Sequence, residues 1–307
     1  MIDAVRGTGL LAANRPVLVM LSGGRDSVCL LDLCVRIAGS QAVRALHVNY
    51  RLRDAADADE RHCQALCDRL GVALEVRRPR RPERGNVQAW ARDVRYAAAG
   101  ELVGEGEIAA GHTATDQLET ILYRLASSPS RRALLGMKPR EGRLVRPLLQ
   151  FTRVETGAYC IEHGLDWRED ETNELGAYAR GRVRAELVPA LKRIHPAAEQ
   201  NVLALAELLR EEAEVLDELV DGVLAGRSDI ELARLRELPL ALRRLVVQRL
   251  ADAALGHPAP GSARRVDEIV ALRHGALDLP HGVRAVVEGG VLRFEPQKQG
   301  ARERAPL

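Results

Sequence analysis

An apolar run that ends in two glycines and opens directly onto an amphipathic segment constrains the fold of this chain more than any other feature. The run V-L-V-M-L occupies residues 17–21, S-G-G-R-D-S follows at 22–27, and apolar residues then recur at helical spacing as far as Val35. This order predicts a buried strand, a tight loop and a helix. Gly23 and Gly24 lack a Cβ atom, so the loop can turn sharply and bring backbone N–H groups close to a ligand.

The predicted loop has the chemistry of an anion site. Its backbone N–H groups form a concave surface, and the positive end of the following helix points into that surface. Ser22 and Ser27 add hydroxyl donors, and Arg25 lies between them. Asp26 puts a carboxylate beside the site, which favours a Mg²⁺ ion between this carboxylate and a phosphate. The alternative is an ordinary strand-to-helix turn with two glycines.

Strand-like and helix-like segments alternate from the start of the chain to about Gly164. The predicted strands after the first cover 43–48, 72–76, 107–110 and 144–148, and the predicted helices cover 59–70, 87–102, 116–125 and 154–163. Alternation of this kind predicts an α/β fold with a doubly wound, mostly parallel sheet and helices on both of its faces.

The pattern changes after Arg182. Apolar residues recur at helical spacing over 205–223 opposite an acidic face, which predicts an amphipathic helix. Two more helices are expected at 240–255 and 263–272, followed by a hairpin over 283–294 that turns at Gly289-Gly290. We therefore expect three parts, an α/β domain over 1–185, a helical region over 186–256 and a small α+β region over 257–307.

Composition excludes several classes of protein. No apolar run reaches the ~18 residues of a membrane span, and residues 1–14 lack the cationic-then-apolar pattern of a secretory signal. A net charge of +2 does not by itself indicate a nucleic-acid binder. The five cysteines include no C-x-x-C pair. We therefore expect buried free thiols in a reducing cytoplasm rather than a metal cluster or a disulfide framework.

A second polar cluster follows the predicted strand at 107–110. His112, Asp116 and Glu119 come directly after it. Because ligands bind outside the carboxyl ends of parallel strands, we expect His112 and Asp116 to face the glycine-containing loop. The alternative for the two carboxylates is a capping role in the first turn of the next helix, with Thr115 as its N-cap.

Two groups of arginines are candidates for binding phosphate or RNA. Arg92 and Arg95 lie three residues apart on one predicted helix, whose N-cap is expected at Asn86, and therefore share a face. Arg180 and Arg184 lie just before the helical region, and from this position they can reach back over the predicted anion site. Guanidinium groups bind phosphates in a bidentate manner. The alternative for both groups is solvent-exposed charge.

The motifs of the chain, taken in order, resemble those of one known family. S-G-G-R-D-S resembles the pyrophosphate loop (PP-loop) of the N-type ATP pyrophosphatases, which split ATP between its α- and β-phosphates and adenylate an acceptor. Over the first ~195 residues the whole set resembles the tRNA(Ile)-lysidine synthases. The motifs are S-G-G-R-D-S, H-V-N-Y-R-L-R, N-V-Q-A-W-A-R-D-V-R-Y, G-H-T-A-T-D-Q-L-E-T, V-R-P-L-L, E-D-E-T-N and R-G-R-V-R-A-E-L-V-P.

The resemblance implies an adenine nucleotide alpha hydrolase-like fold with the catalytic domain over 1–185, and a helical linker or tRNA-binding region over 186–256. It also implies a two-step reaction on the CAU anticodon of tRNA(Ile). The oxygen of the wobble cytosine would attack the α-phosphate of ATP and release pyrophosphate, and the amine of L-lysine would then displace AMP. The base must be splayed out of its loop to be reached, which suits an unpaired anticodon.

The resemblance also implies roles for individual residues. The ATP-binding set, in which Asp26 holds Mg²⁺, is Ser22, Gly23, Gly24, Arg25, Asp26 and Ser27. His112 and Asp116 would lie at the adenylation site, and Glu119 is a candidate for the lysine ammonium. The residues expected to face phosphate, the adenylate or tRNA are Arg92, Arg95, Arg180 and Arg184. Thr113 and Tyr50 stand where many members of the family have histidine, so no direct catalytic role is expected of them.

Two other functions stay open at this point. A tRNA thiolase of the same superfamily would use ATP identically but deliver sulfur, and the lack of a C-x-x-C pair weighs against it. An inactive loop fold that serves as an RNA-binding scaffold is disfavoured by the presence of Asp26, His112 and Asp116. The sequence does not decide between a monomer and a homodimer, nor which features of the tRNA are recognised.

Overall fold

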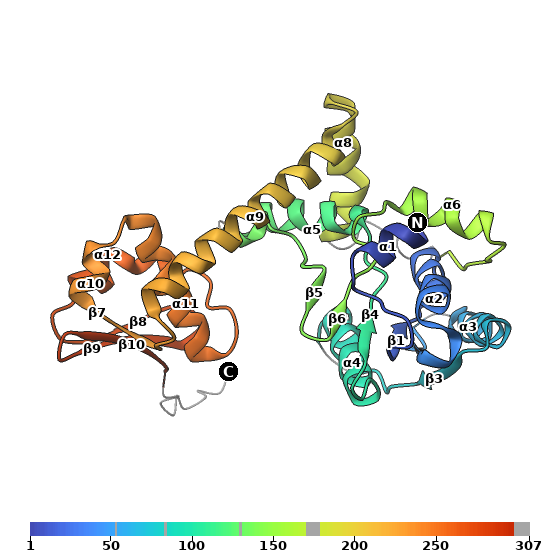
Figure 1. Ribbon diagram of the computed structural model, residues 1–307, viewed down its shortest axis with the longest axis horizontal. Helices are drawn as coiled ribbons and strands as arrows, with labels where there is room; N and C mark the ends of the chain where they lie inside the picture. Colours follow the sequence, from blue (N-terminus) through green and yellow to red (C-terminus); the bar gives the residue numbers. More distant parts are fainter. Residues whose placement is uncertain (53, 83–84, 129–130, 170–178, 298–307) are drawn as a thin grey trace, which may run out of the picture. The chain divides into compact units, whose positions relative to one another are not determined.

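The computed structural model describes residues 1–52, 54–82, 85–128, 131–169 and 179–297, apart from the side chain of residue 180 (Figure 1). The chain divides into two compact units, Met1–Ala206 and Glu207–Leu307. The three-part division expected from the sequence stays a prediction about which segments fold independently.

The first unit is built on a six-stranded sheet in the order β3-β2-β1-β4-β6-β5 (Figure 1). Its strands are β1 (Val17–Met20), β2 (Val43–Val48), β3 (Ala73–Arg77), β4 (Glu107–Ala109), β5 (Arg140–Glu141) and β6 (Leu144–Val145). All neighbours are parallel except β5, which pairs antiparallel with β6. The doubly wound, mostly parallel sheet predicted from the sequence is therefore confirmed.

Strand β1 shows why both faces of the sheet are covered. Val17 and Val19 pack in one apolar cluster, and Leu18 and Met20 pack in another, because successive side chains of a strand point to opposite faces. The first cluster includes residues of α1 (Ile2–Gly7), α2 (Arg25–Ala38), α3 (Ala56–Leu70) and α6 (Arg153–Glu162). The second includes residues of α4 (Val87–Leu102).

The helix boundaries follow from local sequence. Asn86 caps α4 as predicted, since its side chain accepts hydrogen bonds from the N–H groups of Gln88 and Ala89. Helix α5 (Ala114–Ser127) begins earlier than expected, and its N-cap is Thr113 rather than Thr115. The predicted strand at 144–148 is shorter because the chain turns after Val145, where the N–H of Leu149 donates to the carbonyl of Arg146.

The rest of the first unit is helical. A four-residue helix, α7 (Ala179–Arg182), runs into a π-helical turn, η4 (Val183–Leu187), and then into α8 (Val188–Ile194). Val183 packs against Leu118 and Leu122 of α5, which attaches this segment to the sheet domain. The 3₁₀ turns in this unit include η1 (Ser40–Ala42) and η2 (Arg131–Ala133). The long helix α9 (Ala198–Leu224) passes from the first unit into the second.

The second unit has its own apolar core around a four-stranded antiparallel sheet in the order β7-β10-β9-β8. Its strands are β7 (Asp229–Glu231), β8 (Gly275–Asp278), β9 (Val283–Glu288) and β10 (Val291–Pro296). Its further helices are α10 (Leu232–Glu237), α11 (Leu240–Leu255) and α12 (Val266–Ala271), with 3₁₀ turns η5 (Ser262–Arg265) and η6 (Pro280–Gly282). The predicted hairpin at Gly289-Gly290 is confirmed, whereas β7 and β8 were not predicted.

None of the helices in the described part of the chain is both long and apolar enough to cross a membrane.

Candidate functional site

The glycine-containing loop after β1 is held by its own serines. The Ser27 hydroxyl donates to the carbonyl of Gly24 (2.8 Å) and accepts from the N–H of Ser22 (3.2 Å). Gly23 has a φ of +84°, and a Cβ atom there would lie 3.1 Å from the Sγ atom of Cys63. Gly24 is the N-cap of α2 and brings no side chain to cap it. The N–H groups in the first turn of α2 are therefore not capped by a side chain of the N-cap residue, which is the arrangement that an anion site at a helix start requires.

The end of β4 lies directly against this loop. A Cβ atom on Gly111 would be 3.2 Å from the backbone carbonyl of Asp26 and from the N–H nitrogen of Ser27. Only glycine fits there without a shift of the backbone. This contact brings His112, the next residue, beside the start of α2.

His112 is an uncharged imidazole at neutral pH. Burial lowers its pKa to about 4, and the positive charges of Arg146, Arg95 and Arg92 act in the same direction, while Asp116 opposes them. Its Nδ1 atom is buried and has no hydrogen-bond partner within the described residues. A buried polar atom of this kind normally has a partner. His112 is therefore a candidate contact for a ligand.

The two carboxylate oxygens of Asp116 have different partners. Oδ2 accepts from the N–H and the hydroxyl of Thr113 (2.9 Å each), which closes a capping box at the start of α5. Oδ1 lies 3.8 Å from Nη2 of Arg184. The capping alternative raised by the sequence thus applies to one oxygen, and the other faces a cation.

Glu119 is one helical turn further along α5 and is almost fully buried. Both of its oxygens accept from Arg184, at 2.6 Å from Nε and 2.9 Å from Nη2. This bidentate pair raises the pKa of Arg184, so the guanidinium stays charged. Glu119 was predicted to bind the lysine ammonium, yet its carboxylate is taken up by an arginine in the structure.

Helix α4 brings Arg95 toward the same edge of the sheet. The guanidinium groups of Arg92 and Arg95 lie 4.8 and 5.7 Å from the ring centre of Tyr96. Arg92 is exposed, whereas the Nε atom of Arg95 is buried without a hydrogen-bond partner in the described part of the chain. Tyr50 holds this helix, since its hydroxyl donates to the carbonyl of Ala91 (2.7 Å).

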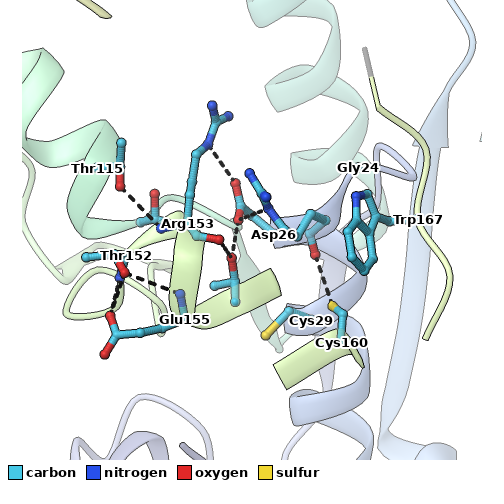
Figure 2. Close-up of polar contacts among 12 residues, drawn as sticks. Gly24, Asp26, Cys29, Thr115, Thr152, Arg153, Glu155, Cys160 and Trp167 are labelled. Carbon is cyan, nitrogen blue, oxygen red and sulfur yellow. Dashed lines mark hydrogen bonds and ion pairs between the residues drawn. The ribbon is translucent and has the colours of Figure 1, made fainter. Parts of the chain in front are cut away.

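The carboxylate of Asp26 has two partners that the sequence analysis missed (Figure 2). Nε of Arg153 lies 3.2 Å from Oδ2, and the hydroxyl of Thr156 donates to Oδ1 (2.5 Å). Both residues belong to α6, more than a hundred residues away along the chain. The Arg25 guanidinium is also near, with its Nε atom 3.8 Å from Oδ1.

A segment after α6 lines the other side of the loop. The N–H of Arg168 donates to the carbonyl of Gly23 (2.9 Å), and its guanidinium binds the buried carboxylate of Asp59 (3.1 Å). Trp167 precedes it, and Figure 2 shows its indole near Gly24. These contacts fix the carbonyl of Gly23, and no pattern in the sequence indicated them.

Comparison with known proteins identifies the family. A family model described as the PP-loop domain matches residues 5–191. The tRNA(Ile)-lysidine synthase of Gloeobacter violaceus is 35% identical over 263 residues, which cover 81% of this chain and 80% of that protein. The chain belongs to the tRNA(Ile)-lysidine synthases of the PP-loop family.

Other relatives agree in sequence but are longer. The tRNA(Ile)-lysidine synthase of Thermus thermophilus is 37% identical over 310 residues, which are 97% of this chain but 59% of that protein. The chain thus spans about six tenths of the length of the Thermus relative. A solved structure of a U34-tRNA thiolase, NcsA from Methanococcus maripaludis, has a TM-score of 0.57 at 15% identity and covers 68% of this chain and 78% of NcsA. That likeness concerns the fold alone.

In this PP-loop protein, most of the predicted site residues converge at one edge of the sheet. The loop residues Ser22–Ser27 run into the start of α2, where the contact of Gly111 places His112 beside them, and a second group on α5 and η4 is formed by Asp116, Glu119 and Arg184. Arg92 lies on the exposed side of α4. The side chain of Arg180 lies outside the described residues.

The PP-loop residues fit a magnesium ion if a nucleotide supplies the other ligands. Within the described residues, no group of three or more His, Cys, Asp or Glu side chains is arranged to hold a metal. Mg²⁺ is commonly bound by one or two carboxylates together with phosphate oxygens and water. Asp26 beside the loop suits that pattern, provided that the Arg153 guanidinium moves away from Oδ2 of Asp26.

Proposed function

We propose that this chain ligates L-lysine to the wobble cytidine in the CAU anticodon of tRNA(Ile) and so forms lysidine. The reaction would pass through an adenylated cytidine, with release of pyrophosphate and then AMP. The observation that carries the proposal is the match of 97% of the chain, at 37% identity, to a relative named tRNA(Ile)-lysidine synthase. We place the reaction in the cytoplasm, where tRNA and reduced thiols occur together.

In the first step, the loop would hold the phosphates of ATP for attack by the cytosine oxygen. The N–H groups at the start of α2 and the hydroxyl of Ser22 are the donors within reach of a pyrophosphate. Mg²⁺ at Asp26 would neutralise charge on the leaving pyrophosphate. Catalysis would then come mainly from positioning and from stabilisation of charge, as in other reactions at phosphate.

His112 would act as a hydrogen-bonding group and not as a proton donor. A pKa near 4 leaves its imidazole neutral at physiological pH. Its unpartnered Nδ1 and the buried Nε of Arg95 are the two atoms that a bound base or adenylate would satisfy. We therefore assign His112 and Arg95 to holding the adenylated cytidine.

In the second step, the lysine ammonium must lose a proton before its amine attacks carbon 2. Asp116 is the proposed acceptor through Oδ1, because Oδ2 is engaged in the capping box. Arg184 would hold the departing AMP, and Glu119 would keep Arg184 in place through its two hydrogen bonds. This replaces the role of ammonium ligand that the sequence suggested for Glu119.

The buried thiols give no support to sulfur delivery by the thiolase alternative. Burial raises the pKa of Cys63 and of Cys67 to about 12, so both are protonated at neutral pH. A protonated thiol is a poor nucleophile and a poor ligand for a metal.

The test measures pyrophosphate release and transfer of labelled lysine with tRNA(Ile) that carries a CAU anticodon. ATP-dependent transfer of labelled lysine to this tRNA supports the proposal. A matched tRNA with uridine in place of the wobble cytidine should receive no label. Pyrophosphate release without lysine transfer would keep adenylation and point to another nucleophile. Absence of release with any tRNA would contradict the proposed reaction.

A further inference from the structure

Two side chains of helix α6, those of Arg153 and Thr156, bind the carboxylate of Asp26. Figure 2 shows the contact with Arg153. Thr156 is fully buried, and its short side chain keeps the hydroxyl between Oδ1 of Asp26 and the backbone carbonyl of Arg153. Arg153 is long, and 30% of its side-chain surface is exposed to solvent. Asp26 therefore has one fixed partner and one that can exchange.

The backbone of Arg153 is fixed on two sides. Its N–H donates to the hydroxyl of Thr115 on α5 (3.2 Å). Thr152 and Glu155 close a capping box around the same turn. On the side of α2, the aliphatic part of Arg25 passes only 3.0 Å from the place of a Cβ atom on Gly157. Movement of Arg153 is consequently limited to its own side chain.

Binding of a nucleotide changes what the Arg153 guanidinium prefers. Within the described residues, the carboxylate of Asp26 is the only ion-pair partner of the Arg153 guanidinium. A triphosphate in the loop brings several negative oxygens to the start of α2, and a cation at Asp26 would repel the guanidinium. Phosphate oxygens bind arginine in the bidentate manner for which the guanidinium is well shaped.

We propose that Arg153 is a phosphate-binding residue, which is paired with Asp26 in the structure and moves to the phosphates of ATP when Mg²⁺ takes the carboxylate. Thr156 is a positioning residue that keeps Asp26 oriented in both states. The inference rests on the proposed use of ATP at this loop, but not on the identity of the acceptor.

The experiment measures binding of a non-hydrolysable ATP analogue by isothermal titration calorimetry, with Mg²⁺ and without tRNA. Arg153→Met should weaken binding by about tenfold or more, as loss of a charge-assisted contact does, and Arg153→Lys should fall between it and the wild type. Arg6→Met is the control, because Arg6 pairs only with exposed Asp3 on α1 within the described residues. Thermal unfolding confirms that each variant is folded.

The positioning role of Thr156 has its own readout. Thr156→Val keeps the shape of the side chain but loses the hydroxyl, so the Mg²⁺ concentration needed for half-maximal binding should rise several-fold. Thr156→Ser keeps the hydroxyl and should behave like the wild type. Equal Mg²⁺ requirements for the valine and serine variants would overturn this role.

Unchanged or tighter binding by Arg153→Met would overturn the phosphate-binding role, since Arg153 would then be only a competitor for Asp26. Analogue binding by the wild type without any lysine transfer would contradict the proposed function and leave the inference about Arg153 standing. Failure of the wild type to bind the analogue would overturn both.

Discussion

Arg184 binds both carboxylate oxygens of Glu119, at 2.6 and 2.9 Å, and approaches Asp116 to 3.8 Å with the same guanidinium. The pair links the π-helical turn η4 to α5, whose N-cap Thr113 directly follows His112. Glu119 is buried, and Arg184 is its one ion-pair partner in the described part of the chain. The ion pair between Arg184 and Glu119 thus connects two segments of the fold and also orients the Arg184 guanidinium toward Asp116.

A double-mutant cycle should reveal the strength of this pair. Arg184→Met leaves the Glu119 carboxylate buried without its partner and should lower the free energy of unfolding by about 3 kcal/mol. The coupling to Glu119→Gln should be about 1–3 kcal/mol. Urea unfolding measures both quantities. The matched cycle on exposed Asp3 and Arg6 should give less than about 1 kcal/mol. Equal coupling energies in the two cycles would show that the buried pair is no stronger than the exposed one.

Removal of the Asp26 carboxylate should stop the first chemical step. Asp26→Asn keeps the hydrogen bond from Thr156 but cannot neutralise a bound cation, so tRNA-dependent pyrophosphate release should fall by at least about a hundredfold. Asp26→Ala should abolish release with little change in folding. The control is Asp3→Asn, a change of equal charge at an exposed side chain. Full activity of either Asp26 variant would refute the assignment of Mg²⁺ to this residue.

His112 predicts how stability depends on pH. Its pKa is about 4 in the folded protein against an ordinary value of 6.5, so the unfolded chain binds the proton more readily between these values. The free energy of unfolding should therefore fall by roughly 2 kcal/mol as the pH falls from 7 to 5. His112→Asn should lack this part of the loss. The check is urea unfolding of both proteins at the two pH values. An equal fall in the free energy of unfolding for the wild type and the variant would contradict the predicted pKa shift.

The sequence predicted what depends on local patterns. Alternating apolar runs indicated the strands, and the S-G-G-R-D-S motif indicated the anion loop. The N-cap of α5 was assigned wrongly to Thr115, although the spacing of Thr113 and Asp116 is that of a capping box. That spacing was the signal that could have identified it.

Other features could not be predicted because they depend on packing between distant segments. Arg153 and Thr156 reach Asp26 only because α6 packs against α2, and nothing near them in sequence specifies this contact. The same holds for Arg168, which meets Gly23 from far along the chain. Strands β7 and β8 are short, and short edge strands leave little periodicity to detect.

Gly23 should tolerate no side chain, for two separable reasons. Its φ of +84° strains any residue with a Cβ atom, and that atom would meet the Sγ atom of Cys63 at 3.1 Å. Gly9 has a similar φ of +66° but nothing within 4 Å of its Cβ position. Gly9→Ala thus measures the backbone strain alone, at about 1 kcal/mol.

Gly23→Ala should cost about 1 kcal/mol more than Gly9→Ala in urea unfolding, because the thiol beneath it must shift in a packed core. The variant should also bind the ATP analogue more weakly, since displacement of the loop moves the donors at the start of α2. Gly9→Ala should leave that affinity unchanged. If the two substitutions cost the same and the affinity stays constant, the contact with Cys63 does not fix the loop.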